Sequence, residues 1–120
     1  MREYNPAKSP DRQQWMALDK TRQLELVRQA HTEMDASESA VTSHCGMHSA
    51  VETQIAENSP GVRNAMGRLR KQGISRHNAI HAIGLVLIQH MRRMATSQDE
   101  PDVANSHYQT KLTELGQHKA

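Results

Sequence analysis

The chain has 120 residues, a formal net charge of +2 and only three aromatic side chains, one Trp and two Tyr. This near-balance of charge and the shortage of stacking rings argue against a nucleic-acid-binding protein. The longest apolar run, residues 82–88, is too short to cross a membrane, and no apolar signal-peptide region opens the sequence. Because Cys45 is the single cysteine, it forms no internal disulfide, and we expect a cytoplasmic protein.

The length fits one small domain, and its core would be thin because only 36% of the residues are hydrophobic. A homodimer interface or a bound metal would add stability. Apolar residues recur at spacings of three and four rather than two, which predicts an all-α fold. We expect a compact helical bundle of about five helices in a single domain, residues 9–116, with flexible termini at 1–8 and 117–120.

Start and stop signals divide the chain into five predicted helical segments. The first begins near Ser9, with Pro10 at its first helical position, and Asp19 could break it and cap a continuation. Pro60 opens the third segment, and Gly73 is well suited to end it. The five segments are 9–34, 39–57, 60–72, 75–95 and 102–116.

Histidines lie in the apolar rows of three of these segments. His44 and His48 are four residues apart in the second segment, and His77 and His81 are four apart in the fourth. His31 continues an apolar row of the first segment. Side chains four apart on a helix point the same way, so each pair can act together. The other three histidines fall outside the rows, and we expect them to be solvated: His90, His107 and His118.

A buried imidazole that lacks a partner costs about 1–3 kcal/mol, and few carboxylates share these rows. One metal ion satisfies several imidazoles at once, so we predict a zinc or iron site between the second and fourth segments. The candidate ligands are His31, His44, His48, Glu52, His77 and His81. Glu52 could instead orient a ligand or act as a base. An open coordination position would permit metal-assisted hydrolysis or small-molecule redox chemistry.

A second class of protein fits the same pattern. Histidines that hydrogen-bond to one another, or that are partly exposed, would suit a non-enzymatic interaction module or a homodimer with a pH-sensitive seam. No phosphate-binding loop, dinucleotide-binding fingerprint or His-Glu-x-x-His motif is present in the sequence. The metal content of the purified protein separates the two classes.

Motifs in the middle of the chain follow a recognisable order. A His-x-x-x-His pair precedes Val-Glu-x-Gln, a short helix that ends in glycine, and Arg-His-x-Ala-Ile-His, in the stretch HCGMHSAVETQIAENSPGVRNAMGRLRKQGISRHNAIHAIG. This order resembles a bacterial family of small all-helical proteins of unknown function, and WMALDKTRQLELVRQAH is similar to the family's opening helix. The resemblance covers roughly residues 15–94. It implies a helical fold and places the six candidate ligands at the family's polar positions, but it implies no activity.

A looser resemblance is to haemerythrin-like bundles. His48-x-x-x-Glu52 and His77-x-x-x-His81 are similar to their ligand spacings, with His31 upstream. The chain departs from that pattern because an extra predicted helix separates Glu52 from His77 and no downstream histidine–aspartate pair follows in the expected order. The resemblance implies a site geometry between helices, without common descent.

Overall fold

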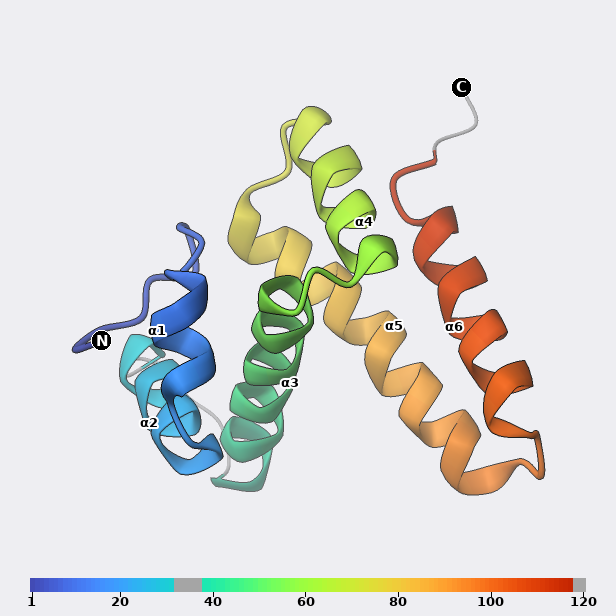
Figure 1. Ribbon diagram of the computed structural model, residues 1–120, viewed down its shortest axis with the longest axis horizontal. Coiled ribbons are helices and arrows are strands. Elements are labelled where there is room, and N and C mark those ends of the chain that lie inside the picture. The colour runs from blue at the N-terminus through green and yellow to red at the C-terminus, as the bar shows by residue number, and fades with distance from the viewer. Residues whose placement is uncertain (32–37, 118–120) are drawn as a thin grey trace.

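The computed structural model describes residues 1–31 and 38–117. Within these residues the chain forms six α-helices and no strand (Figure 1). The helices are α1 (Arg12–Ala17), α2 (Lys20–Ala30), α3 (Glu38–Ala56), α4 (Pro60–Lys71), α5 (Arg76–Thr96) and α6 (Pro101–Glu114). The predicted all-α fold is therefore confirmed. Among the described residues, no helix is both long and apolar enough to span a membrane.

Side-chain caps fix the starts of α2 and α5, two of the helices that position the histidines. The carboxylate of Asp19 accepts a hydrogen bond from the backbone N–H of Arg22 at 2.8 Å. The hydroxyl of Ser75 accepts one from the backbone N–H of Asn78 at 3.2 Å. The first N–H groups of a helix have no partner within it, so such caps determine the residue at which the helix begins.

The chain reverses direction between α4 and α5 at Gly73. This glycine has a φ of +84°, a left-handed conformation that glycine adopts without steric cost. The backbone N–H of Ile74 donates to the carbonyl oxygen of Leu69 at 3.2 Å, which closes the end of α4. The turn brings α5 back into the fold, where it packs against α3, α4 and α6. The fourth predicted segment therefore has a central place in the fold.

The amino-terminal part of the chain confirms one expectation and differs from another. The first predicted segment is broken before Asp19 as anticipated, because Leu18 is extended and Asp19 caps the second helix. Residues 1–8, expected to be flexible, include Tyr4, whose side chain is only 5% exposed because it packs on Trp15 with ring centroids 5.6 Å apart. The predicted end of the first segment, residue 34, and the last three residues of the expected flexible tail, 118–120, lie outside the described residues.

Helix α3 lies between α1 and α2 on one side and α4, α5 and α6 on the other (Figure 1). Each side contains an apolar core to which α3 contributes. The larger core lies among α3, α4, α5 and α6, and its fully buried members are Val51, Ala65, Ala79, Ile80, Ile83 and Leu112. The smaller core joins the amino-terminal segment to α1, α2 and α3 through Tyr4, Trp15, Leu26, Val27, Val41, Cys45 and Ala56. The candidate ligands come from α3, from α5 and from the residue that follows α2.

Candidate metal centre

Five histidines from three parts of the fold meet at one place. His31 follows the last residue of α2, His44 and His48 come from α3, and His77 and His81 come from α5. Each offers one ring nitrogen, and these five atoms all lie within 4.8 Å of one another. The predicted convergence of the two histidine pairs is therefore confirmed. The cluster of these five side chains, called the histidine cluster below, is a place that could hold a metal ion.

Two pairs of ring nitrogens in the histidine cluster are in direct contact. Nε2 of His48 lies 3.0 Å from Nε2 of His81, and Nε2 of His31 lies 3.2 Å from Nε2 of His77. Nitrogens that share one ion through bonds of about 2.0–2.1 Å are separated from one another by roughly 3–4 Å. The spacing of these nitrogens is therefore close to that of ligands on a single ion.

The members of the cluster differ in burial. His48 is fully buried, whereas His31, His44, His77 and His81 are half-buried. The deepest histidine is thus held inside the protein, and the side chains of the other four are partly exposed to solvent. This arrangement leaves a route by which an ion could reach the cluster.

The imidazoles of the cluster favour the uncharged form. Burial, followed by the neighbouring histidines, lowers the pKa of His48 to about 2 and that of His81 to about 4. Burial also lowers the pKa of His44 and of His77. These four side chains are therefore neutral near pH 7, which is the protonation state that binds metals.

The orientation of His31 is fixed by a backbone contact. Its Nδ1 lies 2.8 Å from the carbonyl oxygen of Val27. A carbonyl oxygen only accepts hydrogen bonds, so Nδ1 carries the ring proton and donates it. In the neutral ring Nε2 of His31 is then the nitrogen with the lone pair, and it is the one that faces Nε2 of His77. Histidines that bind metals are commonly held in this way by a hydrogen bond from their second nitrogen.

Glu52 is neither a member of the group of possible ligands nor an exposed charge. Its side chain is 1% exposed, and the guanidinium of Arg76 donates to both carboxylate oxygens at 2.7 Å. The hydroxyl of Tyr4 donates to Oε2 of Glu52 at 2.5 Å and lies 3.3 Å from Nδ1 of His48. Burial, reinforced by the Glu52 carboxylate, raises the pKa of Tyr4, so this hydroxyl keeps its proton. Of the roles considered for Glu52, an indirect one fits these contacts best.

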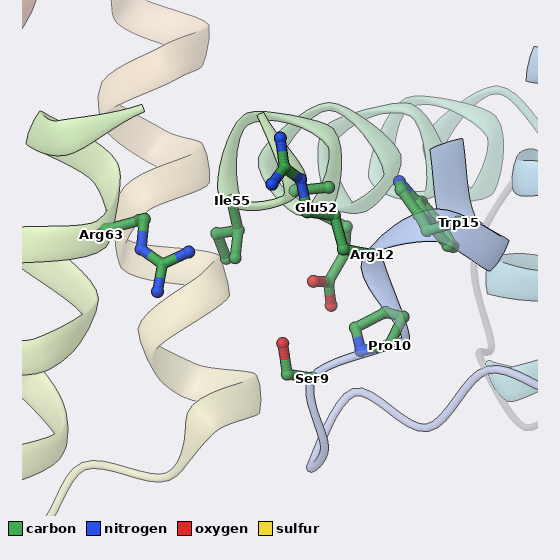
Figure 2. A pocket seen from close by; sticks show the side chains of 8 residues that line it. Ser9, Pro10, Arg12, Trp15, Glu52, Ile55 and Arg63 are labelled. Atoms are coloured by element: carbon green, nitrogen blue, oxygen red, sulfur yellow. The ribbon is translucent and has the colours of Figure 1, made fainter. Parts of the chain in front are cut away.

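Glu52 also borders a small cavity of about 60 Å³ that is partly open to solvent, between the amino-terminal segment, α1, α3 and α4. Figure 2 shows the Glu52 carboxylate projecting from α3 toward Ser9 and Pro10, and Arg12 and Arg63 line the same cavity. None of the five histidines lines this cavity. It is therefore distinct from the histidine cluster, and the contacts from one to the other run through Glu52 and Tyr4.

Tyr4 and Arg76 are site residues that the sequence did not single out. Tyr4 precedes every helix, so no periodicity includes it. Arg76 is the first residue of α5, where the helix dipole disfavours a cation. An arginine at that unfavourable position, next to His77, indicates that the guanidinium has a specific anionic partner. In the structure this partner is Glu52.

Two histidines outside the cluster are less exposed than the sequence predicted. His90 is not simply solvated: it is half-buried, because α5 packs on α6 and the ring stacks on Tyr108 with centroids 4.5 Å apart. His107 is also half-buried, and His118 lies outside the described residues. Cys45 is buried in the smaller apolar core and is not in the group of possible metal ligands.

No family model, curated protein or solved structure matches the chain. The two resemblances drawn from the motifs therefore stay predictions. What the five histidines do is inferred below from their own geometry and chemistry.

Proposed function

We propose that the protein binds one transition-metal ion, zinc or iron, through the histidine cluster. The observation that carries the proposal is the convergence of five ring nitrogens within 4.8 Å. Four of these rings have a lowered pKa and are neutral near pH 7, so an ion would not have to compete with bound protons there.

The kinds of donor in the cluster support the choice of metal. Imidazole nitrogen suits zinc, iron, copper and nickel, whereas magnesium and calcium prefer oxygen ligands. Within residues 1–31 and 38–117, which the structure describes, the group of possible ligands contains no thiolate and no carboxylate. Cys45 packs with apolar side chains, and the Glu52 carboxylate is already bound by Arg76. An all-histidine site is therefore the coordination that we expect.

The number of histidines that bind decides what the site can do. Four or five bound imidazoles would close the shell around zinc and give a structural site. Three would leave an open position, and a bound ion then supplies Lewis-acid chemistry or, for iron, electron transfer. His44, His77 and His81 are half-buried, so part of each side chain is exposed to solvent. We propose metal-assisted hydrolysis or small-molecule redox chemistry as the reaction classes to test.

One observation favours a second candidate function. The His48–His81 and His31–His77 contacts could each be a hydrogen bond between a protonated and an unprotonated ring nitrogen. The cluster would then be a polar network in a non-enzymatic interaction module or homodimer. This network needs no ion, so metal binding distinguishes the two candidates.

The test is a zinc and ferrous-iron titration of protein that was purified without a histidine tag. We expect one ion per chain, and at a free zinc concentration 100 times the dissociation constant we expect a gain of about 2.7 kcal/mol in the free energy of unfolding. His81→Ala should weaken zinc binding, while His107→Ala, which removes a half-buried histidine outside the cluster, should leave it unchanged. Failure of the wild-type protein to bind either ion, or equal binding by both variants, would refute the proposal.

A further inference from the structure

Tyr4 connects the amino-terminal segment to the deepest histidine of the cluster. Its ring packs on Trp15 and meets the His48 ring edge-on, with centroids 6.2 Å apart. The segment that carries it is also tied to α5, because the guanidinium of Arg76 donates to the carbonyl oxygen of Pro6 at 3.1 Å. Figure 2 shows this segment passing close to the Glu52 carboxylate at Ser9 and Pro10.

The positions of the protons follow from these contacts. The Glu52 carboxylate receives two hydrogen bonds from Arg76, and an ionised carboxylate only accepts. Tyr4 has a single proton and lies 2.5 Å from Glu52 Oε2, so it donates that proton to Glu52. The contact of 3.3 Å between Tyr4 and Nδ1 of His48 must then be made by the ring N–H of His48, with the tyrosine oxygen accepting.

This direction of the hydrogen bonds determines which nitrogen of His48 is free. With its proton on Nδ1, His48 has its lone pair on Nε2. That is the nitrogen that lies 3.0 Å from His81 inside the cluster. His31 is held the same way by the carbonyl oxygen of Val27, so the cluster contains two histidines whose Nε2 is prepared to bind.

We propose that Tyr4 is a positioning residue for the metal centre: it selects the tautomer of His48 in which Nε2 is the ligand atom. The proposal rests on the proposed metal-binding function. A hydrogen bond from the second ring nitrogen orients a ligand histidine and raises its basicity. Because Tyr4 belongs to the amino-terminal segment, docking of that segment and binding of the ion favour each other, as coupling between two sites is reciprocal.

The test compares Tyr4→Phe with Tyr108→Phe. Both tyrosines are 5% exposed, and each hydroxyl donates one hydrogen bond to a side chain, Tyr4 to Glu52 and Tyr108 to Gln54. Only Tyr4 reaches the cluster. We expect Tyr4→Phe to weaken zinc affinity by about 10–100-fold, the range for partners that orient a ligand, and Tyr108→Phe to leave it unchanged. Equal weakening in the two variants would indicate a general loss of packing and would overturn the proposal.

Nitrogen NMR of the His48 ring supplies a readout that a purely structural role would not change. In the wild-type protein without metal we expect Nδ1 protonated and Nε2 unprotonated, and in Tyr4→Phe a mixture of tautomers. Zinc should also slow amide exchange in residues 1–10 of the wild type, and should do so less in Tyr4→Phe. Unchanged affinity and an unchanged tautomer would overturn the role of Tyr4 while leaving metal binding intact. A wild-type protein that binds no zinc would instead refute the proposed function itself.

Discussion

The two sides of α3 are built from different kinds of contact. On the side of α4 and α6, the larger core consists of apolar side chains and Tyr108, and six of its apolar members are fully buried. On the side of α1 and α2, beside the smaller apolar core, the fold also buries the polar side chains of Gln23, His48, Ser49 and Glu52, together with Arg76 from the start of α5. Apolar burial stabilises a fold without specific partners, whereas each buried polar group must be satisfied. The proposed metal site therefore lies on the polar side of α3, and the apolar side contributes mainly to the stability of the fold.

The largest effect is expected from the ion pair on the polar side. Glu52→Gln removes the anion from the buried Arg76 guanidinium, and breaking a buried pair in this way costs about 3–5 kcal/mol in the free energy of unfolding. It also loosens Tyr4, so zinc affinity should fall by about 10–100-fold. Urea unfolding with a chelator and a zinc titration measure the two effects. The control is Glu57→Gln, which alters an exposed glutamate just after α3.

If Glu52→Gln changed neither the stability of the metal-free protein nor its zinc affinity, Glu52 would have no role in either region. The site would then consist of the histidines alone.

A substitution on the apolar side should lower the stability of the protein without changing its zinc affinity. Leu112 is fully buried on α6, a helix that contributes no member of the histidine cluster. Leu112→Ala leaves a cavity and should lower the free energy of unfolding by about 2–5 kcal/mol. The zinc affinity of the folded protein should not change, because the substitution removes no ligand or hydrogen bond at the cluster. A loss of zinc affinity in the folded variant would mean that the two regions are not independent.

A change of pH should have a smaller effect on the free energy of unfolding, and this effect should come from the histidines on the polar side. Burial lowers the folded-state pKa of His81 from 6.5 to about 4, so below pH 6.5 the unfolded chain binds protons that the folded chain resists. The free energy of unfolding of the metal-free protein should have its full value above about pH 6.5. It should fall by roughly 1–3 kcal/mol toward pH 4, after allowance for solvent screening. Urea midpoints measured from pH 7.5 to 4 in the presence of a chelator report this slope.

The Leu112→Ala variant sharpens the pH measurement. It should shift the whole stability curve downward without changing its slope between pH 6.5 and 4. Stability that stays flat or increases as the pH falls through this range would contradict the lowered pKa of the clustered histidines.

The helices and the histidine pairs could be predicted from the sequence because they depend on local signals. Asp19, Ser75 and Gly73 mark helix ends, and pairs four residues apart point the same way on any helix. The partner of Glu52 could not be predicted in the same way. Arg76 is 24 positions away and is brought near only by the packing of α3 on α5. Tyr4 lies outside every helix, so only the folded chain places it against His48.

Gly84 is a single position at which the sequence alone could not predict the reason for the residue. It lies one turn beyond His81, where room for a ligand or close helix packing would both require a small residue. A Cβ atom at this position would overlap the side chain of Met47 from α3, so the glycine is explained by packing between α3 and α5. Only the structure distinguishes these reasons, because they leave the same residue in the sequence.

X-ray absorption of the protein loaded with one equivalent of zinc tests the central claim most directly. The histidine cluster predicts a first shell of nitrogen at about 2.0–2.1 Å, with the outer-shell scattering of several imidazole rings and no sulfur. Removal of two cluster members, His48 and His81, should weaken zinc binding and reduce the outer-shell scattering from imidazole rings. A sulfur shell at about 2.3 Å, or a shell of oxygen without imidazole scattering, would show that zinc binds elsewhere and would contradict a histidine metal centre.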